Sequence, residues 1–255
     1  MKEIRRLSVA GSVYEVVLSD ERETLLAAQA AGKAVVGVDG VDCSSVRYLV
    51  ESPEAADDTY LERVVHRKLG LPWIIAEGER IRLREFTRED AERVPKEKTD
   101  TEADAVFYTP EHLDAYIRGQ YAFYECGLWA VERRADGVLL GKAGLTWRTE
   151  MKACTEMGVQ TAMKAQKELD TRTEMDGAFL ELGYHIFEPF RRQGYAEEAC
   201  RLILTFAGEN YASPVKAIVR RKNVASKMLL KKLGFRRIGW LPEAEEKKET
   251  VWVYC

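Results

Sequence analysis

Apolar residues recur along the chain with two different periods, and the alternation between them marks strands and helices in the first 76 residues. Short apolar runs predict strands at residues 13–18, 34–38 and 46–50. A helix capped by Ser19 or Asp20 is expected to end at Gly32. A second helix is expected over 58–69. The order strand, helix, strand, strand, helix predicts a small α/β layer domain over residues 1–76.

The remainder of the chain, residues 79–255, carries a longer series of elements. Apolar runs predict strands at residues 80–86, 128–133, 138–147, 179–186 and 250–254, of which the second and third form a hairpin. Thr87 can cap a helix that Pro95 shortens, and Pro110 stands at the first position of the next helix. Residues 96–103, between these helices, are polar and predict a loop.

The junction between strand 179–186 and the following helix, predicted over 197–208, has the features of an anion site. The junction reads Arg191-Arg192-Gln193-Gly194-Tyr195-Ala196. At a helix N-terminus several backbone N–H groups point outward, and the helix dipole adds partial positive charge. Gly194 lets an anion approach the backbone, and Arg191 or Arg192 can reach a phosphate oxygen. The junction therefore predicts a phosphate-binding loop.

Three sequence patterns in the same order resemble the GNAT superfamily of N-acyltransferases. The junction at 191–196 follows the Arg-x-x-Gly-x-Ala pattern of the loop that holds the pyrophosphate of coenzyme A. Glu181-Leu182-Gly183-Tyr184 is similar to the fourth strand of the ribosomal-protein acetyltransferase-like (RimJ/RimL) branch. The pattern Asn-x-x-Ser…Leu-Gly-Phe…Gly over 223–239 resembles a later signature of that branch. Over 79–255 the resemblance implies an α/β (α+β) GNAT fold with a mixed, mostly antiparallel sheet flanked by helices.

The resemblance also implies acetyl-CoA as the donor and names residues that meet it. The strand end at Ile186 and Phe187 would pair with the amides of pantetheine. Asn223 would contact the coenzyme arm, and Ser226 would lie near its sulfur, although Asn223 is also a good N-cap for its own helix. Many members carry a tyrosine acid seven residues after this Asn, whereas this chain has Leu230. Protonation of the leaving thiolate is then left to Ser226 or solvent.

Acetyl transfer to an amine also requires that the amine arrive uncharged. A lysine-like amine with a pKa of ~10.4 is the free base in about one part in a few thousand at pH 7, which corresponds to ~4–5 kcal/mol. A general base typically contributes ~10²–10⁴-fold. Glu181 is the candidate, because on a strand it shares a face with Gly183 and His185 beside the expected thioester. Two alternatives stay open: Glu181 pairs with an Arg of the neighbouring strand, or His185 takes the proton.

Composition narrows the class of protein and its partners. A net charge of −3 over 255 residues argues against a general nucleic-acid-binding surface. No apolar run approaches the ~20 residues of a membrane helix. The five cysteines and three histidines are dispersed and predict neither a disulfide framework nor a metal site. We expect a cytoplasmic, metal-free enzyme that does not act at membranes.

Two segments have less definite roles. Residues 1–76 resemble the closing half of a haloacid dehalogenase-type phosphatase, because a Ser-Asp pair precedes an Ala-rich helix that ends in Ala-Gly. The Asp-x-Asp nucleophile of that family is absent, so we expect a structural or partner-binding domain. The alternative is ligand sensing or substrate capture, with Asp20 and Asp39 as the contacts. Residues 149–177 form a polar insertion, either a solvated arm or a lid over the acceptor site or a homodimer contact.

The patterns together predict an N-acetyltransferase that moves an acetyl group directly from acetyl-CoA to a primary amine. The acceptor would be a protein N-terminus or a small-molecule amine, and residues 88–124 with the insertion would shape its pocket. The alternative is a catalytically weak acyl-CoA-binding module that regulates or binds a partner.

Overall fold

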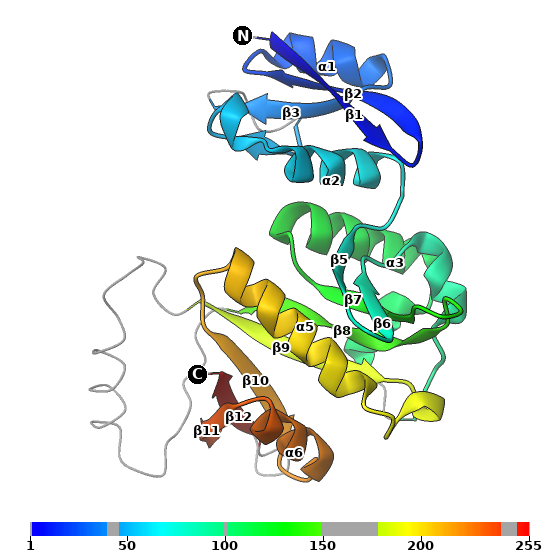
Figure 1. Cartoon of the computed structure of the whole chain (residues 1–255), viewed down its shortest axis with the longest axis vertical. Coiled ribbons are helices and arrows are strands. Elements are labelled where there is room, and N and C mark those ends of the chain that lie inside the picture. Colours follow the sequence, from blue (N-terminus) through cyan, green and yellow to red (C-terminus); the bar gives the residue numbers. More distant parts are fainter. Residues whose placement is uncertain (1, 40–45, 99–100, 149–177, 241–248, 255) are drawn as a thin grey trace, which may run out of the picture. The chain divides into compact units, whose positions relative to one another are not determined.

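The computed structural model describes residues 2–39, 46–98, 101–148, 178–240 and 249–254 and divides into two compact units (Figure 1). The first unit contains Met1–Ile74, Glu85–Arg93 and Asp100–Glu125, and the second contains Ile75–Arg84, Val94–Thr99 and Cys126–Cys255. Two segments of the predicted acyltransferase region therefore belong to the same unit as the N-terminal domain. The polar insertion at 149–177 lies outside the described residues.

The N-terminal domain is built on a four-stranded sheet whose strand order follows the sequence. Its strands are β1 (Lys2–Val9), β2 (Ser12–Ser19), β3 (Ala34–Val38) and β4 (Leu49–Val50). β1 and β2 are antiparallel, and β2–β3 and β3–β4 are parallel. β1 was not predicted, because half of the residues in this edge strand are charged and only Leu7 and Val9 are buried.

Helices cover both faces of this sheet, which explains its continuous apolar runs (Figure 1). Val17 of β2 packs in one core with Leu25 of α1 (Arg22–Ala30). Its neighbour Val16 points to the opposite face, where Leu61 of α2 (Asp58–Lys68) is buried. Both predicted helices are confirmed, but the N-cap of α1 is Glu21 rather than Ser19 or Asp20. A short 3₁₀ turn, η2 (Pro53–Ala55), precedes α2.

The rest of the first unit is helical. It consists of η3 (Arg88–Arg93) and η4 (Glu102–Phe107), both 3₁₀, α3 (Pro110–Tyr116) and η5 (Ile117–Tyr124), which has π-helical geometry. η3 replaces the α-helix expected after Thr87, whose N–H donates to the Asp90 carboxylate at 2.9 Å. α3 begins at Pro110 as predicted. The expected polar loop at 96–103 ends earlier, because η4 already starts at Glu102.

The second unit contains an eight-stranded sheet in the order β11-β12-β10-β9-β8-β7-β6-β5. Its strands are β5 (Ile74–Glu77), β6 (Ile81–Arg84), β7 (Leu128–Arg133), β8 (Leu139–Arg148), β9 (Phe179–Ile186), β10 (Val215–Arg220), β11 (Phe235–Trp240) and β12 (Glu249–Tyr254). β9 and β10 are parallel, and the other pairs with a determined register are antiparallel. The predicted mixed, mostly antiparallel sheet is confirmed. β5 was not predicted.

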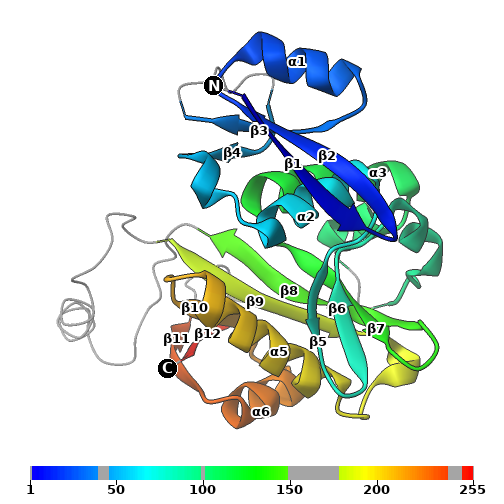
Figure 2. The ribbon, with the colours of Figure 1, turned by 45° about the horizontal axis from the view of Figure 1, so that its top comes forward.

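Two helices pack on this sheet, α5 (Tyr195–Asn210) and α6 (Val224–Lys232), as Figure 2 shows. α5 buries the apolar stripe read from the sequence, including Ala199 and Ile203. The fully buried Trp129 of β7 meets the ring of Phe206 edge to face at 5.4 Å between centroids. Such aromatic pairs add about 0.5–1.5 kcal/mol beyond the burial of their area. The stripe therefore fixes α5, and with it the junction at 191–196, against the sheet.

Candidate active site

β9 loses its neighbour on one side partway along its length. It pairs with β8 throughout, but its parallel pairing with β10 covers only Leu180 and Glu181. The N–H of Leu180 donates to the Pro214 carbonyl at 3.0 Å, so the backbone groups of Leu180 face β10. Because these groups alternate between the two edges of a strand, those of Tyr184 face the same side, beyond the paired region. Among the residues that the structure describes, no strand continues this pairing beyond Glu181, so β9 presents backbone donors and acceptors along an open edge.

The open edge leads into the predicted phosphate loop. After β9 the chain makes a short turn, η6 (Glu188–Phe190), and α5 then begins at Gly194, an N-cap residue without a side chain. The first helical bond runs from the N–H of Glu198 to the Gly194 carbonyl, so the preceding N–H groups of α5 have no intrahelical acceptor. Arg192 has φ of 65° and Gly194 has φ of 85°. An arginine in this left-handed region costs about 1–2 kcal/mol, and such strain is frequent in ligand-binding loops.

The two arginines of the loop have different roles. The Nε of Arg191 donates to the Ile186 carbonyl at 2.8 Å, and its guanidinium pairs with the carboxylate of Glu97. Arg191 therefore connects the loop to the end of β9 and to Glu97. Arg192 is exposed, and within the part of the chain that the structure describes its side chain forms no ion pair. Arg192 is the loop cation that is available to an anion.

Glu97 is a site residue that the sequence analysis missed. Its side chain is 7% exposed and accepts hydrogen bonds from the Arg191 guanidinium, the backbone N–H of Glu188 and the Nε2 of His185, the last at 2.8 Å. One buried carboxylate thus joins the end of β9, the turn η6 and the phosphate loop. No local signal marks it, because Glu97 lies in a polar stretch and these three partners are about 90 residues away in sequence.

Arg80 holds the other side of the loop and was also missed as a site residue. Its guanidinium donates to the Gln193 carbonyl at 2.9 Å and to the Glu198 carboxylate at 2.8 Å, and it lies 4.8 Å from the centre of the Tyr195 ring. A Cβ on Gly194 would stand 3.2 Å from this guanidinium. Close packing and a positive φ therefore both favour glycine at this position.

The predicted base, Glu181, lies on β9 with its side chain half-buried, on the same strand face as Gly183 and His185. Its Oε2 accepts a hydrogen bond from the Nε of Arg148 on β8 at 2.7 Å. Glu181 therefore does pair with an arginine of the neighbouring strand, which was the alternative stated for it. His185 on the same face is bound to Glu97 instead.

Asn223 and Ser226 lie together at the start of α6, where the Asn223 Oδ1 accepts the Ser226 N–H at 3.0 Å. Asn223 is thus the N-cap, as the alternative reading of this pair expected. The Tyr184 hydroxyl donates to the Ser226 carbonyl at 3.4 Å and ties β9 to α6. Burial raises the pKa of Tyr184 to about 12, so its phenol stays protonated at neutral pH. Leu230 is fully buried and offers no acid.

Comparison with known proteins identifies the family of this chain. Residues 80–236 match the acetyltransferase (GNAT) domain family, which is more than half of the chain. The chain belongs to the GNAT acetyltransferase family. Members of this family are acyltransferases that use acetyl-CoA.

Solved structures show the same fold at low identity. A putative GNAT-family acetyltransferase from Bordetella pertussis is 17% identical, with a TM-score of 0.51 over 72% of this chain and 99% of its own. RimL, a ribosomal L7/L12 α-N-protein acetyltransferase solved with coenzyme A, is 13% identical, with a TM-score of 0.51 over 71% of this chain and 97% of its own. None of these matches supports the phosphatase resemblance of residues 1–76.

The residues of the loop fit the donor of the family. Outward N–H groups at the start of α5, the exposed Arg192 and the small Gly194 suit the pyrophosphate, and the open edge of β9 suits the pantetheine amides. The thiol of Cys200 is buried in α5, and burial raises its pKa, so Cys200 is core rather than a nucleophile. Among the described residues, no group of His, Cys, Asp and Glu could hold a metal ion, and no helix is long and apolar enough to span a membrane.

Proposed function

We propose that this chain is an N-acetyltransferase that transfers an acetyl group from acetyl-CoA to a primary amine. The observation that carries the proposal is the continuity of the open edge of β9 with an uncapped helix N-terminus. Bound acetyl-CoA supplies the acetyl group as a thioester. The N–H groups of Tyr195 and Ala196, with Gln193 beside them, bind the phosphates, and Arg192 neutralises their charge.

The open edge orients the pantetheine arm through backbone groups of Tyr184 and the N–H of Ile186. The predicted contact of Phe187 is not used, because its N–H donates to the Leu140 carbonyl at 2.9 Å, and the Ile186 carbonyl accepts from Arg191. Asn223 shapes the start of α6 near that arm, and the Ser226 hydroxyl donates a hydrogen bond to the departing sulfur. These roles place the reacting carbonyl beside β9, where one backbone N–H serves as the oxyanion donor. Removing such a donor typically costs about 10²–10³-fold in turnover.

Glu181 is the proposed base that accepts the proton of the amine. Arg148 binds Oε2 of this carboxylate, which leaves Oε1 to take the proton. His185 is the second candidate, with Nδ1 as its accepting atom, because its Nε2 faces Glu97. The amine nitrogen forms a bond to the acetyl carbon as the carbon–sulfur bond breaks, and no covalent enzyme intermediate is needed.

The acceptor class can be tested directly by measuring thiol release. The full chain is incubated with acetyl-CoA and a panel of amines: peptides with free N-terminal Ser or Ala, N-blocked lysine peptides, polyamines and amino sugars. The N-terminal peptides are included because one structural neighbour is an α-N-protein acetyltransferase. We expect amine-dependent thiol release and an acetylated product of +42 Da, the mass of an added acetyl group.

Calorimetry with acetyl-CoA separates the two function classes. Donor binding without thiol release for any amine would refute the enzyme assignment and favour the alternative, an acyl-CoA-binding regulatory or partner-binding module. Absence of donor binding would refute both. Release in the absence of an acceptor serves as the blank.

A further inference from the structure

The C-terminal part of the second unit carries a dense group of positive charges. Residues 210–242 contain nine lysines and arginines and no aspartate or glutamate. Since the net charge of the whole chain is −3, the other residues together carry −12. Charges clustered in this way create a positive potential on one part of a protein that is acidic elsewhere, and such a potential attracts an anionic partner.

Four of these cations surround one hollow in the surface, whose volume is about 530 Å³. Four cationic and two aromatic residues line it: Lys227, Lys231, Arg236, Arg237, Phe235 and Trp252. The two lysines lie on α6 and the other four residues on β11 and β12, elements of the second unit that Figure 2 shows together. Both aromatic residues are only 3% exposed. A ligand in the hollow therefore meets mainly the aliphatic stems and charged groups of the four cations.

The exposed face of α6 adds apolar side chains to these cations. Val224 is 63% exposed and Met228 is 68% exposed. With Lys227 and Lys231 they follow the i, i+3, i+4, i+7 spacing of one helix face. Exposed apolar side chains that gather in one place mark an interaction surface, whereas single ones need no explanation. Ser226 projects about 200° away from Val224 around the helix, so this face is separate from the hydroxyl proposed to meet the sulfur.

The strand beside the hollow is the edge of the sheet. Among the described residues β11 pairs only with β12. Arg236 and Arg237 are exposed on this strand. Charges on an edge strand discourage pairing between identical chains. In a symmetric dimer built through this surface the same cations would also face one another. A second copy of the chain is therefore disfavoured as the occupant.

Nucleic acid fits the surface less well than a protein segment does. Its phosphates repeat along the whole strand, so the −12 carried by the rest of the chain repels every part that extends beyond the surface. Single strands also stack their bases on accessible aromatic rings, whereas Phe235 and Trp252 are buried. A phosphate backbone makes no use of the exposed Val224 and Met228. An acidic segment of a protein is short, and it can carry apolar side chains between its carboxylates.

We propose that the α6–β11 surface, which consists of Val224, Met228 and the six residues that line the hollow, docks an acidic segment of a partner protein. Carboxylates of the segment pair with Lys231 and Arg237, and its apolar side chains cover Met228. Docking needs no acetyl transfer and is therefore independent of the proposed function.

Fluorescence anisotropy of the full chain tests the proposal without acetyl-CoA. The probe is a peptide of about 12 residues in which Glu and Leu alternate, with the dye on its N-terminus so that it is not an acetyl acceptor. A peptide of alternating Lys and Leu and a single-stranded oligo-dT of similar length are the comparison probes. The variants are Lys231→Gln, Arg237→Gln and Met228→Ser. Lys232→Gln is the matched control, because Lys232 lies on the same helix but pairs with Glu197 and does not line the hollow.

We expect the Glu-Leu peptide to bind the wild-type chain and to bind more weakly as salt rises. Each of Lys231→Gln, Arg237→Gln and Met228→Ser should raise its Kd about 2–5-fold, and Lys232→Gln should leave it within about 1.5-fold. The Kd for acetyl-CoA should stay within about 2-fold in all four variants. If Arg237→Gln fails to fold, Lys231→Gln and Met228→Ser decide, since both residues are exposed.

Several results would overturn the proposal. The first is that the wild-type chain does not bind the Glu-Leu peptide, and the second is that Lys231→Gln and Lys232→Gln weaken binding equally. Tighter binding of oligo-dT would assign the surface to nucleic acid, and self-association lost in Lys231→Gln would assign it to a second copy. Peptide binding that requires Glu245→Gln/Glu246→Gln would assign it to the chain's own acids, which follow β11 in the sequence. A wild-type chain without thiol release refutes the proposed function and leaves this binding test intact.

Discussion

Replacing Glu97 with glutamine is the sharpest test of how the donor loop is held. In the native chain this one carboxylate accepts from Arg191, His185 and the N–H of Glu188. Glutamine has nearly the same shape but only one accepting oxygen, and its NH₂ group would face a donor. The substitution therefore removes charge and at least one acceptor without opening a cavity. We expect the turn after β9 to loosen while the sheet remains folded.

The size of the effect follows from burial. Hydrogen bonds to charged groups contribute about 1.5–3 kcal/mol each. Arg191 and His185 are partly exposed, so solvent screening reduces their share. A net loss of about 2 kcal/mol in unfolding free energy corresponds to a fall in Tm of roughly 4–8 °C for a chain of this size. If about 1–2 kcal/mol of this lost free energy had stabilised the loop in its binding conformation, the Kd for acetyl-CoA should rise about 5–30-fold.

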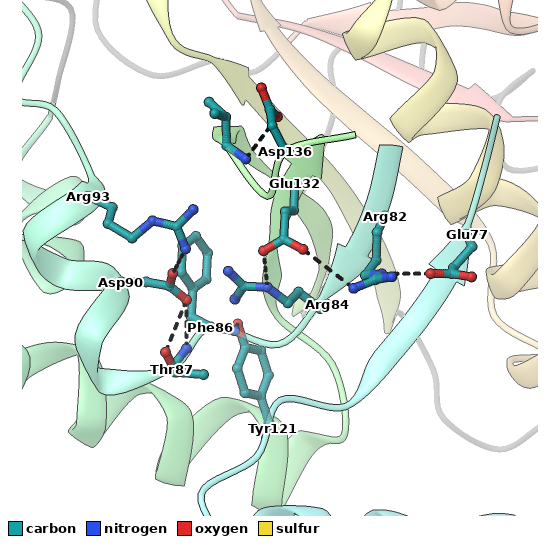
Figure 3. Close-up of polar contacts among 11 residues, drawn as sticks. Glu77, Arg82, Arg84, Phe86, Thr87, Asp90, Arg93, Tyr121, Glu132 and Asp136 are labelled. Atoms are coloured by element: carbon teal, nitrogen blue, oxygen red, sulfur yellow. Dashed lines mark hydrogen bonds and ion pairs between the residues drawn. The ribbon is translucent and has the colours of Figure 1, made fainter. Parts of the chain in front are cut away.

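The matched control is Glu132→Gln. Glu132 is 12% exposed, accepts a hydrogen bond from Arg84 at 2.8 Å and forms an ion pair with Arg82 at 3.6 Å (Figure 3), and neither partner belongs to the loop. Both variants are compared by calorimetry with acetyl-CoA and by thermal unfolding. We expect a similar fall in Tm for both and weaker donor binding only for Glu97→Gln. If Glu97→Gln weakens binding no more than the control does, Glu97 does not position the loop.

Three further predictions concern single groups. Arg192→Gln should weaken acetyl-CoA binding about 3–10-fold at low salt without a change in Tm. Arg191→Gln should lower both the affinity for acetyl-CoA and the Tm. Calorimetry at several salt concentrations, together with thermal unfolding, distinguishes the two variants. Glu181→Gln should lower turnover near neutral pH by about 10²-fold with an unchanged Kd for acetyl-CoA, and unchanged turnover would remove Glu181 as the base. Burial raises the pKa of Tyr184 from 10.0 to about 12, so between these pH values only the unfolded state loses the proton and stability falls. Tyr184→Phe should therefore lose less stability than the wild type in urea unfolding from about pH 9.5 to 11, and equal slopes would contradict this assignment.

Much of the fold could be predicted because its elements carry their own local signals. The strand Phe179–Ile186 and the helix beginning near Tyr195 both have regular apolar spacing, and Pro110 marks the start of α3. β1 and β5 could not be predicted, since edge strands need few buried residues. The 3₁₀ and π-helical geometry of η3 and η5 depends on tertiary contacts that no local pattern records.

The candidate site likewise contains residues that could be predicted from local sequence and residues that could not. The loop at 191–196 was readable because binding a phosphate there requires glycine and a nearby cation, and these residues are adjacent in sequence. Sequence could not distinguish Arg191 from Arg192, because the difference lies in Glu97, a distant residue. Nor could it show that Arg148 engages Glu181, since the strands that pair them are joined by a long insertion.

The donor loop could be predicted from the sequence and the acceptor could not, and this difference has a physical origin. The proposed donor site consists largely of backbone groups at a strand edge and a helix end, so many sequences can form such a site provided that a few residues shape the chain. An acceptor pocket depends instead on side chains that tertiary packing brings together from distant parts of the sequence, so no adjacent pattern of residues records it.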